Sequence, residues 1–139
     1  MTESARELRF LGAALALAGL VLLAQLVGWR VHDALADEPT RRELTETCLR
    51  EEKGLTLAPP RRDPIAATAA GGAVSTVVET NRVTIVFAPH EEEAERVAAA
   101  YRAVGGPLVG RLEIRESTVY FWARPASPTQ RQQLYDCQY

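Results

Sequence analysis

Hydrophobic and polar positions divide the chain into one long apolar run and a longer segment of mixed pattern. Residues 10–29 carry no charge, and only Gln25 among them is strongly polar. A helix of this length spans about 30 Å, the thickness of the hydrocarbon core of a bilayer. Trp29 ends this run and Arg30 follows it, and both residue types favour the headgroup zone. The pattern predicts a transmembrane anchor over residues 10–30, in contact with the lipid bilayer, behind a cytoplasmic tail over residues 1–9.

A cleaved signal peptide is the alternative interpretation of this segment. Ala34-Leu35-Ala36 fits the small-x-small pattern of a cleavage site. The apolar run is, however, longer than the roughly 7–15 residues of a signal peptide, and charged residues separate it from that site. We therefore expect a retained single-pass signal-anchor with the C-terminal domain outside the cytoplasm, and keep cleavage after Ala36 as the alternative.

After a linker over residues 31–39, the spacing of apolar residues predicts a domain of helices and strands. Helices are expected where apolar residues recur every three or four positions behind a capping residue, and strands where β-branched residues alternate with others. The expected helices cover residues 37–54, 65–70, 90–104 and 128–135. The expected strands cover residues 73–79, 83–88, 111–116 and 118–124. Pro59-Pro60 and Arg61-Arg62-Asp63 predict an irregular, solvated segment between the first two helices.

The order of these elements favours the α+β class. The helix between the two predicted hairpins acts as a crossover, so strand 83–88 runs parallel to strand 111–116 if both belong to one sheet. We therefore expect domain 40–139 to be a two-layer sandwich, with a four-stranded mixed sheet and its helices on one face.

The two cysteines lie near opposite ends of this domain, at Cys48 and Cys137. The chain has no Cys-x-x-Cys motif, and both histidines are far from the thiols in sequence, which argues against a zinc or redox centre. A structural disulfide and two unrelated buried thiols are the remaining options; behind an export segment the compartment is oxidising, so a Cys48–Cys137 disulfide is the expected one. In the chain-entropy model, closing so long a loop stabilises the fold by about 4–5 kcal/mol.

Charge and motifs favour neither a nucleic-acid-binding protein nor an enzyme. The formal net charge is −2, so a nucleic-acid partner is not expected. His90 and the three glutamates after it fit the start of a helix better than a metal site. Glu113 and Glu116 fall on a solvated strand face and in a turn, and no nucleotide fingerprint is present. We expect no catalytic residue, no metal and no cofactor; an envelope enzyme that uses His90 or Glu93 is the weakest alternative.

Strand 118–124 is apolar on both faces and is the strongest candidate for a binding surface. Tyr120 and Trp122 share one of these faces. If that face is uncovered, the two rings form an aromatic–cationic patch with three nearby arginines, Arg111, Arg115 and Arg124. If a terminal helix covers it, Tyr120 and Trp122 are core residues instead.

Four segments of the domain carry a resemblance to known proteins: Cys48–Leu55, Asp63–Ala67, Val83–Phe87 and Gln130–Cys137. Lys53 is the only lysine of the chain. Together the four segments resemble uncharacterised small exported proteins of high-GC Gram-positive bacteria. The resemblance implies no activity and assigns no functional residue. With the anchor and the cysteines, it predicts a non-catalytic interaction or accessory module of the cell envelope that has a protein partner. The alternative is a secreted small binding protein or inhibitor.

Overall fold

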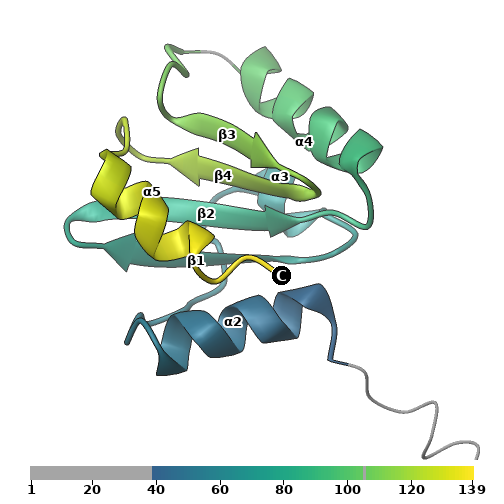
Figure 1. Cartoon of the computed structure of the whole chain (residues 1–139). Helices are drawn as coiled ribbons and strands as arrows, with labels where there is room; N and C mark the ends of the chain where they lie inside the picture. The colour runs from purple at the N-terminus through teal and green to yellow at the C-terminus, as the bar shows by residue number, and fades with distance from the viewer. Residues whose placement is uncertain (1–38, 105) are drawn as a thin grey trace, which may run out of the picture. The chain divides into compact units, whose positions relative to one another are not determined.

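The computed structural model describes residues 39–104 and 106–139 (Figure 1). The predicted tail over residues 1–9, the anchor over residues 10–30 and nearly all of the linker lie outside these ranges. Within the described ranges, no helix has the length and apolar character needed to cross a bilayer.

The described residues form helices and strands in the predicted order, which confirms the α+β class. The helices are α2 (Arg41–Glu51), α3 (Pro64–Ala67), α4 (Glu91–Ala103) and α5 (Pro128–Tyr135). The strands are β1 (Ala73–Val78), β2 (Asn81–Phe87), β3 (Leu112–Arg115) and β4 (Thr118–Trp122).

The ends of the helices follow from side chains that satisfy free backbone groups. At the start of α2, the Thr40 hydroxyl accepts from the Glu43 amide, and the Glu43 carboxylate accepts from the Thr40 amide at 2.7 Å. This hydrogen bond from the Thr40 backbone lowers the pKa of Glu43. Ser127 and Gln130 form the equivalent capping box of α5. The box at Ser127 confirms the predicted start of α5 at residue 128, whereas α2 begins at Arg41 and not at the predicted residue 37, because Thr40 caps it.

All four strands form one antiparallel sheet in the order β1-β2-β4-β3. The prediction of a mixed sheet is wrong, because β4 lies between β2 and β3. Strands β2 and β3 still point the same way, but they are not neighbours. The positions agree with the side chains: β4 is apolar on both faces and is central, whereas β3 carries Glu113 and Arg115 and lies at an edge.

Helices cover both faces of the sheet, so the predicted two-layer arrangement with helices on one face is also wrong. Helices α2 and α5 pack on the face that carries Ile85 and Trp122. Helices α3 and α4 pack on the opposite face, which carries Val86 and Val119 (Figure 1). Because β2 and β4 bury apolar side chains on both faces, the sheet needs a cover on each side.

The predicted disulfide joins Cys48 of α2 to Cys137, just after α5. The two Cα atoms are 5.5 Å apart and the sequence separation is 89 residues. Next to the disulfide, the Lys53 ammonium contacts the Asp136 carboxylate at 2.8 Å and lowers the pKa of Asp136. The first and last helices of the described domain are therefore connected by a covalent bond on one face of the sheet.

Candidate functional site

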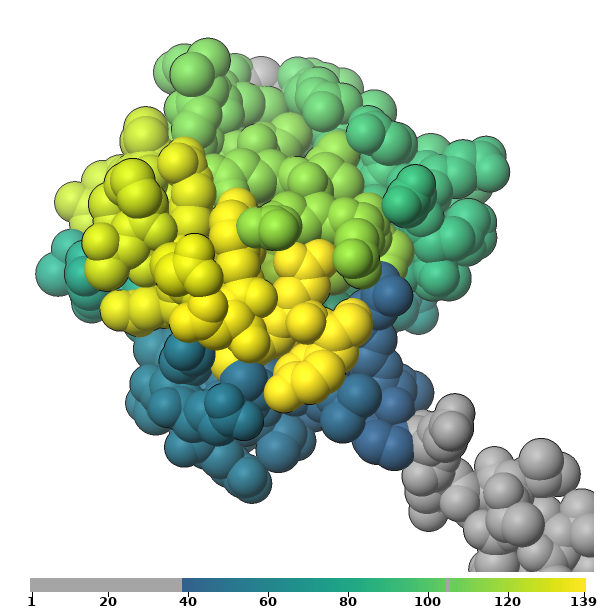
Figure 2. Space-filling view, viewed as in Figure 1, coloured from purple at the N-terminus to yellow at the C-terminus, as the bar shows by residue number. Residues whose placement is uncertain are grey.

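The predicted patch around Tyr120 and Trp122 does not form. Both side chains are 0% exposed, and the Tyr120 ring packs edge-on against Tyr135 of α5, with centroids 5.4 Å apart. Figure 2 shows this face covered by the C-terminal segment, drawn in yellow, above α2, drawn in blue. The interpretation of both residues as core residues under a terminal helix is confirmed.

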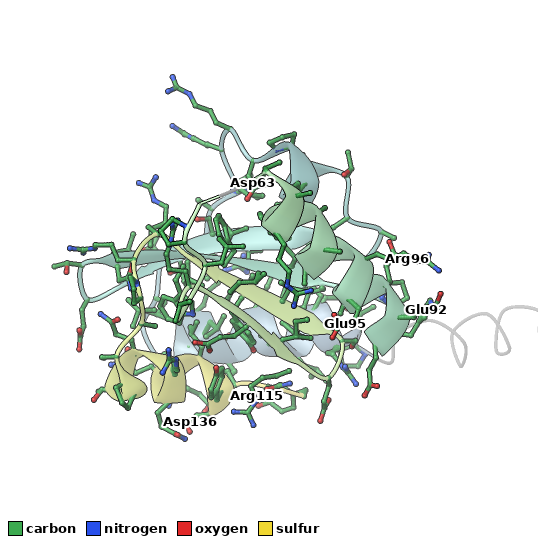
Figure 3. All side chains as sticks on the ribbon, turned by 90° about the horizontal axis from the view of Figure 1, so that it is seen from above. Asp63, Glu92, Glu95, Arg96, Arg115 and Asp136 are labelled. Carbon is green, nitrogen blue, oxygen red and sulfur yellow. A yellow bond between two sulfur atoms is a disulfide. The ribbon has the colours of Figure 1, made fainter. Side chains whose placement is uncertain are left out.

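The three arginines of that predicted patch have separate local contacts. The Arg111 guanidinium lies 5.3 Å from the Phe121 centroid and donates to the Trp122 carbonyl at 3.0 Å. Arg115 lies over the Tyr135 ring, 4.0 Å from its centroid and beside α5 (Figure 3). Arg124 donates to the Thr80 carbonyl at 2.6 Å. These contacts hold loops and helix α5 in place and do not assemble a common site.

The acidic start of α4 has a structural role. His90 is its N-cap residue, and three glutamates occupy the first turn, where they face the positive end of the helix dipole. Arg96 forms ion pairs with Glu92 and Glu93 one turn later (Figure 3). No group of metal-ligating side chains occurs in residues 39–104 and 106–139.

The best candidate for a functional site is a hollow on the face of the sheet that α3 and α4 cover. Its volume is about 440 Å³, and it lies between α3, the C-terminal end of α4, β2 and β4. Its apolar lining comes from Tyr101, Phe121 and Val104, and Val104 is 72% exposed. Helix α3 has four residues and therefore leaves this part of the face open.

The walls of this hollow are fixed by aromatic stacking and a hydrogen bond. The rings of Tyr101 and Phe121 stack with centroids 4.4 Å apart. The Tyr101 hydroxyl donates to one oxygen of Asp63 at 2.7 Å, while the other oxygen caps α3 by accepting from the Ala66 amide at 3.0 Å. Burial, followed by the contact with Asp63, raises the pKa of Tyr101. Figure 3 shows Asp63 between the ribbons of α3 and α4, where this bond connects them.

A second hollow of about 560 Å³ continues from the first, because Arg61, Arg82 and Thr84 line both. It lies between the segment after α2 and strand β1, and Val77 in its lining is 47% exposed. We refer to the two hollows and their arginines, Arg61, Arg62 and Arg82, as the arginine groove.

The arginines of the groove differ from the other basic residues of the described domain. Within residues 39–104 and 106–139, Arg61, Arg62 and Arg82 have no ion pair, side-chain hydrogen bond or ring contact. Every other arginine in those ranges, and Lys53, contacts a carboxylate, a carbonyl oxygen or an aromatic ring. Arg62 also has a left-handed backbone with φ 58°, which is uncommon for a residue with a side chain and recurs at binding sites.

The groove has the chemistry of a binding site. Two carboxylates line it: that of Asp63 is bonded to Tyr101 and to the start of α3, and that of Glu79 accepts from the Gln130 side-chain amide at 3.0 Å. The described lining also includes the hydroxyl-bearing residues Thr56, Ser75, Thr76 and Thr84, but no histidine or cysteine. Guanidinium groups above an aromatic floor can hold an anionic group and an apolar group at the same time.

Sequence reasoning did not identify this groove. It assigned Arg61 and Arg62 only to a solvated segment, and it left Arg82 between the expected strands 73–79 and 83–88. A usable signal was the pair of arginines next to Pro60, but nothing local connects that pair to Arg82. The register Val77↔Arg82 places Arg82 on the open face of β2 and so brings it to the groove.

No family model, curated protein or solved structure matches the chain. The interpretation of the arginine groove therefore depends on its own residues.

Proposed function

We propose that this chain is a non-catalytic, single-pass membrane protein whose extracytoplasmic domain binds a protein partner through the arginine groove. The observation that carries the proposal is that three arginines without partners in the described domain line one groove with an aromatic floor. Clustered like charges repel each other, and an anionic ligand removes this repulsion while making charge-assisted hydrogen bonds. Arginine and aromatic residues are also enriched among the residues that dominate binding energies.

Two features support a location outside the cytoplasm. Residues 10–29 are apolar over a bilayer-spanning length. The cysteines are paired in a buried disulfide, and structural disulfides persist in oxidising compartments. The proposal therefore joins an anchor, a cross-linked domain and a basic groove that is open to a partner.

Location is tested by adding protease to sealed cells and by alkylating the unreduced protein. We expect the protease to digest the domain and the alkylating reagent to label neither Cys48 nor Cys137. A protected domain with two reactive thiols would exclude the extracytoplasmic location.

Binding is tested by cross-linking the full chain in native membranes. We expect an adduct that is lost in the triple variant Arg61→Glu, Arg62→Glu and Arg82→Glu. The matched control reverses the same number of charges outside the groove, at Arg50, Arg96 and Arg102, and keeps the adduct. An adduct that both variants lose, or that both keep, would exclude the groove as the binding surface.

The alternative function is a secreted small binding protein or inhibitor, which Ala34-Leu35-Ala36 favours as a cleavage site. The same groove would then act in solution. The intact mass of the mature protein distinguishes the two, because cleavage after Ala36 makes Asp37 the first residue.

A further inference from the structure

We infer that the arginine groove binds an extended acidic peptide segment with an aromatic or aliphatic anchor residue. This inference rests on the proposed function and adds the chemical class of the partner.

The first hollow fits the anchor residue. Its volume of about 440 Å³ is within the range of roughly 300–1,000 Å³ that is common for ligand pockets. The stacked rings of Tyr101 and Phe121 form a rigid apolar floor. The exposed Val104 side chain forms part of the apolar wall beside it. An aromatic or leucine side chain would bury apolar surface here on both partners.

The arginines fit carboxylates on either side of that anchor. Arg61 and Arg62 come from the segment before α3, and Arg82 comes from strand β2, so the charges reach the groove from two directions. A guanidinium binds a carboxylate through two parallel hydrogen bonds. In an extended peptide, side chains two positions apart point to the same side, so an acidic residue two positions from the apolar anchor would face the arginines while the anchor fills the first hollow.

The length of the groove favours a peptide over a single anion. Arg61 and Arg82 line both hollows, so two guanidinium groups lie where the anchor site joins the second hollow, and the Glu79 carboxylate of that hollow accepts from Gln130 at 3.0 Å. Inorganic phosphate would leave the apolar floor unused. A flat lipid surface would reach the exposed guanidinium groups but not the floor of a hollow.

The test measures binding of a fluorescent peptide with Glu two positions before and two positions after a Phe or Leu anchor to the full chain in nanodiscs of zwitterionic lipid. We expect saturable binding that weakens as salt is added, because part of the attraction is between exposed charges. The same peptide with Gln for Glu should bind at least about tenfold more weakly, as should the Glu peptide to the Arg61, Arg62 and Arg82 triple variant. The Arg50, Arg96 and Arg102 control should stay within about twofold of wild type.

The apolar anchor is tested separately. Val104→Glu places a charge at the side of the first hollow, at an exposed residue, and should weaken binding of the Glu/Phe peptide at least about tenfold. Val109→Glu is the control, because Val109 is 89% exposed and does not line the hollow. Equal effects of the two substitutions would overturn the assignment of the anchor. Thermal unfolding of every variant identifies any that fails to fold.

Each of the following results would overturn the inference. They are equal binding of the Glu and Gln peptides, arginine-dependent binding to phosphatidylglycerol vesicles without binding to the peptide, and self-association of the chain that the triple variant abolishes. Loss of the cellular adduct in the triple variant, without binding to the peptides, would reject the acidic peptide and leave the proposed function intact. If the adduct does not depend on the arginines, the proposed function fails whatever the peptides do.

Discussion

The two faces of the sheet are covered in different ways, and strand β4 shows the contrast within neighbouring residues. Tyr120 and Trp122 point to the face of α2 and α5 and are fully buried. Phe121 points to the face of α3 and α4, remains half-buried and forms the floor of a groove. One face is closed by two helices that a disulfide connects, and the other is left partly open by a helix of four residues.

This difference separates stability from binding in a small domain. The closed face holds the largest buried side chains and the cross-link, so we expect it to supply most of the free energy of unfolding. The open face has exposed apolar residues and unpaired arginines, which contribute little to that free energy and are available to a partner. Substitutions on the two faces should therefore affect different measurements.

The largest effect is expected from the disulfide. Replacing Cys48 and Cys137 together with Ser should lower the free energy of unfolding by about 4–5 kcal/mol, because the unfolded chain regains the entropy of a loop of 89 residues. Urea unfolding followed by tryptophan fluorescence measures the change. Wild-type protein with its disulfide reduced is the control and should match the variant. An unchanged unfolding midpoint would show that the closed face does not depend on the cross-link.

The next largest effect on the free energy of unfolding is expected from Trp122, which we compare with its neighbour Phe121 in β4. Trp122→Ala should cost about 3–5 kcal/mol, because it leaves a cavity in a fully buried core. Phe121→Ala removes a half-buried ring and should cost about half as much, while removing the floor of the groove. Chemical unfolding measures both, and peptide binding should be lost in Phe121→Ala alone. Equal costs would mean that the two faces contribute equally to stability.

Local features of the fold could be predicted from the sequence because their determinants lie within a few residues. The capping boxes at Thr40 and Ser127 and the alternation in β2 required no knowledge of distant segments. The disulfide followed from the cysteine positions and the export segment. The neighbours of β4 could not be predicted, because the second strand of a hairpin can take either the inner or the outer position, and only side-chain burial across the whole sheet decides.

The candidate site was missed for the same reason. From the sequence alone, Tyr120 and Trp122 fit a pair of surface residues. In the structure α5, which follows later in the chain, covers both side chains. In the sequence Arg61 and Arg82 are two separate charges. In the structure the sheet and α3 bring them to the same groove. Both outcomes depend on contacts between distant segments, which neither composition nor periodicity reports.

Alkaline pH should lower the free energy of unfolding through Tyr135, which packs on the closed face. Burial, followed by a hydrogen bond to the Glu113 carboxylate, raises the pKa of Tyr135 to about 12. The unfolded chain ionises near the ordinary value of 10, so the folded state holds its proton while the unfolded state loses it. The stabilisation is complete below about pH 10 and falls between about pH 10 and 12. Tyr135→Phe should make stability decline less steeply over that window in urea unfolding, whereas the exposed Tyr139→Phe should not. Equal slopes in both variants would exclude this role of Tyr135.

The smallest effect on stability is expected from the arginine groove. Replacing Arg61, Arg62 and Arg82 with Gln should change the free energy of unfolding by no more than about 0.5 kcal/mol, because the described structure gives these side chains no partner to lose. Relief of repulsion between them would make the change slightly stabilising. Arg131→Gln is the control on the closed face, where the guanidinium is ion-paired with Glu113, and it should be destabilising. A loss larger than about 1 kcal/mol in the groove variant would assign its arginines to the fold, and the contrast between a closed face that stabilises and an open face that binds would fail.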